Sequence, residues 1–317
     1  MFKKRFISML VLLMTAVTGA MAQTNYKVSV KEGTEDATSW TITPAEATTT
    51  GVAAGTEVKA TYSGAKKVKS VKAVKKPGLP VVNGKFSVSD TKQVYFSKGN
   101  LKYNGSAWSF FDNQYDYLTT HDGTNWDKFG WSTSATTYGM NTSTENIYSG
   151  DFVDWGATMG TGWFTLTSDE WTYLFNTRSA STVNGTANGR YAKAKVNDVQ
   201  GMILFPDTYT HPDGVTAPKG VNATDNTGWN GNNYSSADWT EMESAGCVFL
   251  PAAGYREGST LVNADTNASG NYWSATHHST ADYASYNVSF TTGTLNTAGA
   301  SRRKYGCSVR LVWQVTE

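Results

Sequence analysis

Only two segments of this chain combine the spacing of an amphipathic helix with the residues that begin one. In the segment 166–175, Thr167 and Glu170 match a capping box ahead of an apolar stripe. In the segment 236–246, Ser236 can cap the start of a second helix. The rest of the chain shows short strand-like runs separated by turns rich in glycine and asparagine. We therefore predict an α+β fold in which strands dominate and helices are few.

The chain divides at a break rich in proline and glycine. Residues 26–76 contain four strand-like runs with alternating apolar and polar side chains, and lysine follows the open face. The sequence Pro-Gly-Leu-Pro at 77–80 interrupts this pattern, and ten of the eleven tryptophans come after it. We expect a small all-β module at 23–76, a linker at 77–84 and a second domain at 85–317.

The first 22 residues, 1–22, have the pattern of a signal peptide. Lys3, Lys4 and Arg5 precede an uncharged apolar run, and small residues mark a cleavage site after Ala22. The run is too short to span a bilayer, and no other segment is apolar enough to do so. The protein is expected to be secreted or displayed at the cell surface, with the periplasm as the alternative.

Composition excludes several classes of function. The chain has 27 basic and 26 acidic side chains, so no overall field attracts nucleic acid or an anionic membrane. Paired carboxylates occur only on the two predicted helices, where capping or a solvated face explains them. The four histidines lack the spacing of a zinc site. We expect no catalytic residue, no metal and no cofactor. Calcium remains an open alternative through Asp207, Asp213 and Asp225, although no EF-hand spacing is present.

Two cysteines, Cys247 and Cys307, lie in the part of the chain that is expected to be exported. An oxidising compartment permits a disulfide between them, but spacing along the sequence does not show whether they meet. The sequence leaves this bond open.

The strongest candidate for a ligand surface is the segment 273–305. Between residues 282 and 290 alternate positions separate into two faces. Tyr283, Ser285 and Asn287 would point outward, and Ala284, Tyr286, Val288 and Phe290 would point to the core. Tyrosine beside small hydroxyl and amide residues is typical of antibody loops. The alternative is an ordinary solvent-exposed sheet face. The predicted ligand-binding residues are His277, His278, Tyr283, Ser285, Asn287, Asn296, Arg302, Arg303, Tyr305 and, in a polar loop upstream, Trp229.

Several blocks of the second domain occur in an order that resembles a known family. These blocks are 94–103, 129–131, 154–156, 162–171, 201–207, 245–256, 270–276 and 306–312. The set is similar to the Fibrobacter succinogenes major paralogous domain found in secreted proteins of Bacteroidetes. That domain resembles the formylglycine-generating-enzyme branch of the C-type-lectin fold, which also holds the variable proteins of diversity-generating retroelements. The first module looks like one copy of the short β repeats of bacterial surface proteins.

The resemblance implies a C-type-lectin-like domain over residues 85–317 whose C-terminal loops bind an extracellular protein or glycan, as in an adhesin or receptor. It also implies that a retroelement could diversify residues near 277–305. The chain lacks the calcium-loop motifs of sugar-binding lectins, and its cysteines do not match the active-site pair of formylglycine-generating enzymes. An enzyme of that type and a structural subunit of a surface appendage are the alternatives.

Overall fold

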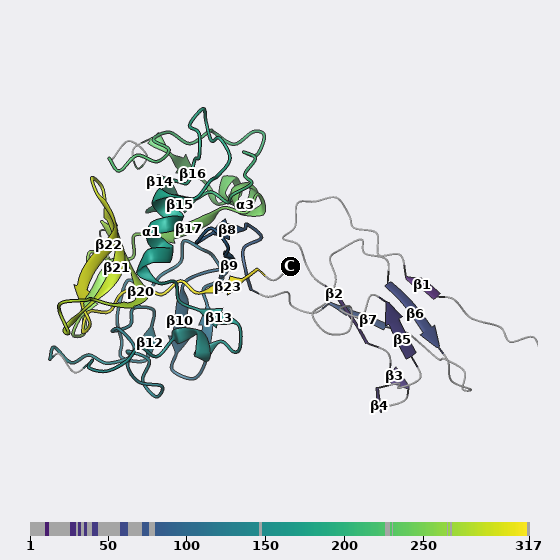
Figure 1. Cartoon of the computed structure of the whole chain (residues 1–317), viewed down its shortest axis with the longest axis horizontal. Coiled ribbons are helices and arrows are strands. Elements are labelled where there is room, and N and C mark those ends of the chain that lie inside the picture. Colours follow the sequence, from purple (N-terminus) through teal and green to yellow (C-terminus); the bar gives the residue numbers. More distant parts are fainter. Residues whose placement is uncertain are drawn as a thin grey trace, which may run out of the picture. The chain divides into compact units, whose positions relative to one another are not determined.

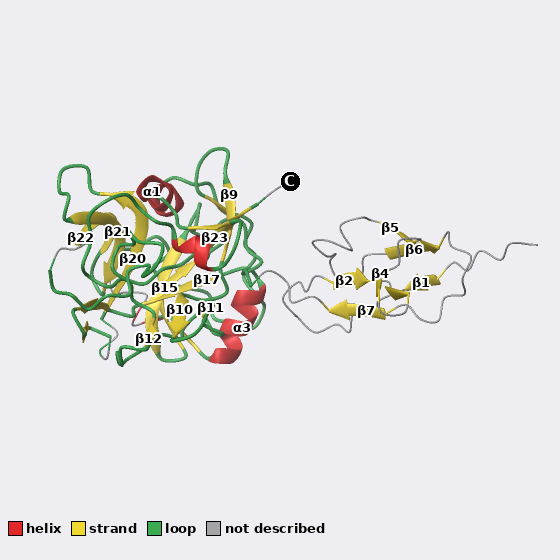
Figure 2. Cartoon of the chain, turned by 90° about the horizontal axis from the view of Figure 1, so that it is seen from below, coloured by secondary structure: helices red, strands yellow, loops and turns green. Residues whose placement is uncertain are grey.

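The computed structural model describes residues 80–145, 148–225, 229, 231–264, 266 and 268–315, together with seven short strands that precede residue 80. The chain forms two compact units, residues 1–80 and residues 81–317. Figures 1 and 2 show both units.

The described part of the first unit consists of strands. They are β1 (Leu10–Leu12), β2 (Tyr26–Ser29), β3 (Lys31–Glu32), β4 (Glu35–Asp36), β5 (Trp40–Thr43), β6 (Val58–Tyr62) and β7 (Lys72–Lys75). β6 lies between β1 and β5, while β2 pairs with β7 and β3 pairs with β4, all antiparallel. Apart from β1, the predicted signal peptide lies outside the described residues.

The second unit begins and ends in one sheet. Its strands are β8 (Phe86–Ser87), β9 (Gln93–Phe96), β13 (Trp163–Phe164) and β23 (Val312–Gln314), in the order β13-β23-β9-β8. Val94 and Phe96 alternate inward along β9 and are fully buried, so the strand follows the two-residue period of its apolar side chains. The antiparallel pairing of β23 with β9 joins the two ends of the unit.

A second sheet contains β14 (Tyr191–Val196), β15 (Val199–Leu204), β16 (Asn233–Tyr234) and β17 (Val248–Pro251). The turn between β14 and β15 has only two residues, Asn197 and Asp198, with φ angles of 48° and 65°. Asn and Asp adopt this left-handed conformation more readily than other non-glycine residues, which explains the tight hairpin.

A third sheet, coloured yellow-green in Figure 1, contains β20 (Ser269–His277), β21 (Ala284–Thr291) and β22 (Leu295–Arg302), with β21 in the middle. Shorter elements complete the unit: β10 (Leu101–Asn104), β11 (Trp108–Phe110), β12 (Asn125–Trp126), β18 (Tyr255–Glu257), β19 (Thr260–Val262) and the 3-10 helix η2 (Trp155–Thr158). The register of β20 on β21 shifts between Trp273 and His277, so the two strands do not alternate in step along their full length.

The two described α-helices are α1 (Ser168–Asn176) and α3 (Ser236–Ser244). The predicted capping box of Thr167 and Glu170 is confirmed at α1. At α3 the predicted cap is wrong by one residue. Ser235, not Ser236, is the cap, because its hydroxyl accepts from the backbone N–H of Asp238, whose carboxylate reaches back.

The core of the second unit consists of three apolar clusters. One surrounds α1 and includes Phe96, Trp171 and Val288. A second lies beneath α3, and a third is formed mainly by tryptophan and phenylalanine rings. The second unit is therefore rich in β-strands and carries two short α-helices, as predicted. No described helix is long and apolar enough to cross a membrane.

Candidate functional site

Four of the predicted ligand-binding residues meet at one end of the third sheet. His277 ends β20, and its Cα pairs with that of Ser285 on β21. Arg302 ends β22 and pairs with Ala284, and the backbone N–H of His278 donates to the carbonyl of Ala284 at 3.2 Å. Tyr283 directly precedes β21. The strand ends therefore place the backbones of His277, His278, Tyr283 and Arg302 at the same end of the sheet.

Tyr283 is the most distinctive residue at this end. It is 54% exposed and is the one large apolar side chain classed as exposed among the described residues. Three residues further along β21, the half-buried ring of Tyr286 packs on His278 with ring centroids 4.8 Å apart. The backbone of Tyr283 is held because its carbonyl accepts from the N–H of Arg303 at 2.8 Å. We call His277, His278, Tyr283, Tyr286 and Arg302 the sheet-end surface.

The predicted outward orientation of Ser285 and Asn287 is wrong. Ser285 is fully buried and Asn287 is 2% exposed. Their neighbours Val288 and Phe290 do face the apolar core, so the predicted alternation holds. The opposite face of β21 is covered as well, and burial of both faces is the reason for the error.

Arg303, also predicted to bind ligand, forms part of that cover. It is 6% exposed, and its Nε donates to the hydroxyl of Ser285 at 3.2 Å. Its guanidinium lies 4.5 Å from the ring centre of Trp131 and donates to the carbonyl of Tyr148. Burial lowers the pKa of Arg303. Its hydrogen bonds are directed inward, so the prediction of an exposed basic cluster fails at this residue.

Asn296 and Tyr305 lie away from the sheet-end surface. Asn296 is exposed, but it pairs with Ser289 toward the other end of β22. Tyr305 is half-buried, with its ring centroid 5.4 Å from that of Tyr255.

The prediction for Trp229 is also wrong. This tryptophan is 1% exposed, and its Nε1 donates to the carbonyl of Gly201 at 2.8 Å. The ammonium of Lys193 lies 5.4 Å from the centre of its ring. The polar residues on both sides of Trp229 indicated a surface loop. Polar neighbours in the sequence do not exclude burial of the tryptophan ring itself, which packs into the core.

Both cysteines are free and buried. Cys247 belongs to the cluster beneath α3 and Cys307 to the cluster of tryptophan rings, so the disulfide that the sequence left open is absent. Burial raises the pKa of both thiols, which keeps them protonated and unreactive.

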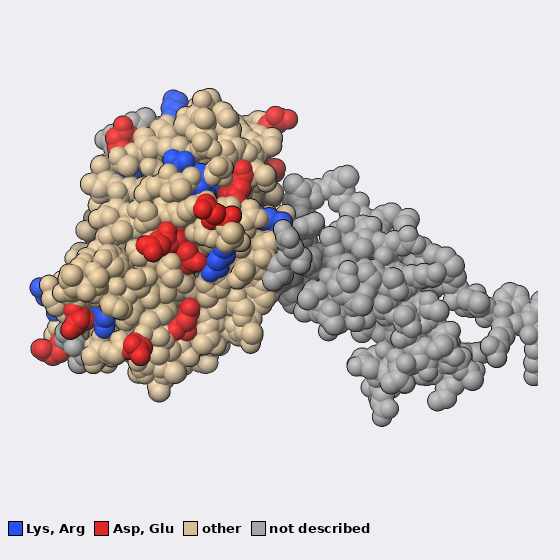
Figure 3. Space-filling view, in the orientation of Figure 1, with Lys and Arg blue, Asp and Glu red and all other residues tan. Residues whose placement is uncertain are grey.

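The described residues contain no group of three or more His, Cys, Asp or Glu side chains that could hold a metal ion. Asp207, one of the calcium candidates, is occupied by protein groups: it accepts from Arg178 at 2.8 Å and from Ser87 at 2.7 Å. Glu170 is likewise used by the capping box and by Lys92 at 2.7 Å. On the face shown in Figure 3, acidic and basic side chains are scattered among uncharged residues.

Sequence reasoning missed one member of the sheet-end surface, Tyr286, which it placed in the core with Val288. The two-residue period favoured that assignment, and only the position of Tyr286 close to the strand end hinted at partial exposure.

Comparison with known families gives one finding for this region. A family described as a domain of unknown function (DUF8237) matches residues 224–312, which include α3 and β17 to β22. The match thus contains the sheet-end surface. Searches of the curated proteins and of the solved structures return no match.

Proposed function

We propose that this chain is a non-catalytic binding protein whose sheet-end surface contacts an extracellular protein or glycan. The observation that carries the proposal is the exposure of Tyr283 at the end of a three-stranded sheet. An exposed tyrosine on an ordered backbone offers a large contact area, and few torsions become fixed when a partner binds.

The residues beside Tyr283 suit an adaptable polar interface. His277 and His278 can donate or accept hydrogen bonds, and Arg302 adds a planar cation. The strand ends that carry them are tied by the pairing of β20 with β21 and of β21 with β22. Little ordering of the main chain is then required on binding, which favours affinity.

Export and a C-type-lectin-like fold are part of the same proposal. The resemblance of many sequence blocks supports the fold, and so does the pairing of the last strand, β23, with β9 near the start of the unit. The pattern of the first 22 residues supports export as a secreted or surface protein. If a retroelement varies residues 277–305, variation is expected at exposed positions such as Tyr283 rather than at buried Ser285, Asn287 and Arg303.

The test compares two exposed positions on one sheet. A photoreactive benzoylphenylalanine replaces Tyr283 in one variant and Asn296 in a matched control near the other end of the sheet. Both are exposed to a glycan array and to extracellular proteins of the natural habitat. We expect covalent cross-links to a protein or glycan with the Tyr283 variant alone.

The partner identified in this way is then titrated against Tyr283→Ala and Asn296→Ala. Loss of a hot-spot tyrosine weakens binding by about 2 kcal/mol, or roughly thirtyfold. The control should bind as the unchanged chain does. Equal affinity of both variants would place the binding surface elsewhere.

A further inference from the structure

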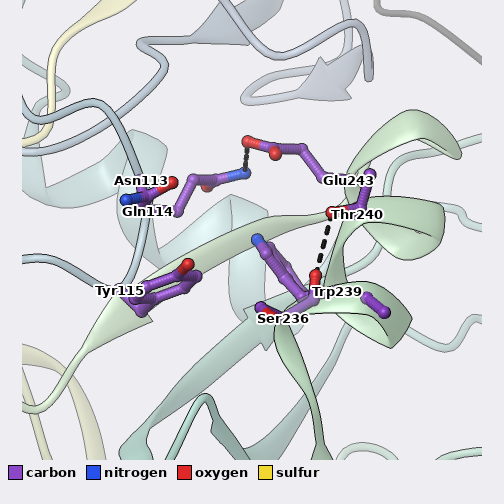
Figure 4. A pocket seen from close by; sticks show the side chains of 8 residues that line it. Asn113, Gln114, Tyr115, Ser236, Trp239, Thr240 and Glu243 are labelled. Carbon is purple, nitrogen blue, oxygen red and sulfur yellow. Dashed lines mark hydrogen bonds between the residues drawn. The ribbon is translucent and has the colours of Figure 1, made fainter.

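A pocket of about 200 Å³ lies beside α3, where the helix faces the segment 113–115. Figure 4 shows its lining side chains, among them Tyr115, Trp239 and Glu243. In Figures 1 and 2, α3 and β22 lie on opposite sides of the second unit. The pocket is therefore separate from the sheet-end surface, and a ligand bound in it would not depend on the function proposed for that surface.

Trp239 supplies an unused hydrogen-bond donor to this pocket. The residue is 2% exposed, and its ring packs on Phe249 with centroids 5.5 Å apart. Its Nε1 is buried and has no hydrogen-bond partner. In Figure 4 the indole nitrogen lies on the edge of the Trp239 ring that is turned toward the side of Gln114 and Glu243, which also line the pocket. A buried N–H without a partner costs free energy, so a group that accepts from it would be bound favourably.

Glu243 supplies an acceptor in a fixed position. Its Oε1 accepts from Nε2 of Gln114 at 2.8 Å. Gln114 is fully buried, and its own oxygen accepts from the backbone N–H of Phe249 and from Arg310. These bonds fix which end of the Gln114 amide faces Glu243. A carboxylate with one such bond still has lone pairs for a ligand.

Burial of the Glu243 carboxyl group reduces the stability of the folded chain. Desolvation by burial raises its pKa above the ordinary value, although the bond from Gln114 opposes this shift. The ionised form is therefore less favourable in the folded chain than in the unfolded chain at neutral pH. A group that reduces stability and borders a pocket is a candidate for binding.

The two groups together select the chemistry of the ligand. A hydroxyl group can accept from the indole N–H and donate to the carboxylate, whereas an anion would be repelled by Glu243. An ammonium group would pair with Glu243 but leave the indole N–H unsatisfied. The exposed side chains of Asn113 and Thr240 and the half-buried Tyr115 add polar groups at the rim.

We propose that this pocket binds a single pyranose ring through its hydroxyl groups, with Trp239 as donor and Glu243 as acceptor. The pocket is smaller than those that enclose drug-sized ligands, and it suits one sugar ring with neighbouring units outside. Free monosaccharides and the terminal unit of a glycan share this chemistry.

The test follows the indole N–H signal of Trp239 in a proton–nitrogen correlation spectrum of the full chain, assigned with the variant Trp239→Phe. The probes are glucose, galactose, mannose and N-acetylglucosamine, together with their methyl glycosides. We expect at least one sugar to shift this signal in a saturable way. Binding of methyl glycosides would indicate a glycan unit, and binding of reducing sugars alone would indicate a free monosaccharide.

Glu243→Gln should weaken that binding by about ten- to a hundredfold, since a hydrogen bond to a charged acceptor is lost. The same variant should be at least as stable at neutral pH, so weaker binding would not reflect unfolding. Glu241→Gln, an exposed position on the same helix, is the matched control and should leave affinity unchanged. The proposal is overturned if no sugar shifts the Trp239 signal, if Glu243→Gln binds as tightly, or if trimethylammonium compounds saturate the site instead.

Discussion

Two buried tryptophans differ in whether the indole N–H has a hydrogen-bond partner, and replacing each by phenylalanine tests what that partner contributes. Trp131 and Trp171 are both 1% exposed. Nε1 of Trp131 donates to the carbonyl of Ser274 at 2.9 Å, whereas Nε1 of Trp171 is buried without a partner. The chemical change is the same at both positions. The difference between the two variants therefore reports the hydrogen bond of Trp131 together with the contact of its ring with the Arg303 guanidinium.

The expected magnitudes follow from what each ring contacts. Both substitutions remove the same ring volume from a packed core, at a cost of about 1–2 kcal/mol in the free energy of unfolding. At Trp131 the change also leaves the Ser274 carbonyl without this donor, which adds about 1–3 kcal/mol. At Trp171 it removes a donor that was already unsatisfied. We expect Trp131→Phe to be the more destabilising by about 1–3 kcal/mol.

Urea unfolding of the chain, followed by near-ultraviolet circular dichroism, gives both values by linear extrapolation. Ten of the eleven tryptophans lie in the second unit, so the aromatic signal reports mainly on that unit. Trp171→Ala sets the scale: the ring packs on Phe96 and Phe175, and its loss should cost about 3–5 kcal/mol. Equal losses for the two phenylalanine variants would refute the reasoning, and a loss below about 1 kcal/mol for Trp171→Ala would place that ring at the surface.

Three further outcomes are expected. Burial lowers the pKa of Lys193 from 10.5 to about 8, so the unfolded chain holds this proton between those values while the folded chain does not. Stability should therefore rise with pH above about 8 in the unchanged chain and lose that contribution in Lys193→Met, as urea midpoints on either side of pH 8 would reveal. Cys247 and Cys307 should resist alkylation in the folded state and react fully in denaturant; labelling of the folded chain, read by mass spectrometry, would contradict their burial. Residues 81–317 expressed alone should unfold in one cooperative transition, and a broad, probe-dependent transition would show that this unit needs the first.

Local signals in the sequence were sufficient for the helices and for the inward face of β21. Thr167 and Glu170 are three residues apart, and their capping box depends on no distant group. Val288 and Phe290 follow the two-residue period of a strand and enter the core as predicted. These features are specified by neighbours in the chain, which is why sequence alone predicts them.

The candidate sites depend on contacts that are remote in sequence. Ser285 is buried because Arg303 and residues near Trp131 cover the second face of its strand. No pattern in the sequence around Ser285 predicts that these residues lie there. The pocket beside α3 joins Gln114 to Glu243, which are 129 residues apart. The absence of a hydrogen-bond partner for Nε1 of Trp239 likewise becomes visible only in the folded chain. Contacts between segments so far apart depend on the whole fold, and local sequence patterns do not predict them.

The pairing of β9 with β23 has a mechanical consequence. These strands are antiparallel neighbours, with Val94 opposite Gln314 and Phe96 opposite Val312. Tension applied between Val94 and Gln314, which pair at the same end of the two strands, would load the backbone hydrogen bonds of this pair one after another. Tension applied between Phe96 and Gln314, which lie at opposite ends of the pair, would load the same bonds together. A pulling experiment anchored at residues 94 and 314 should therefore separate β9 from β23 at lower force than one anchored at residues 96 and 314.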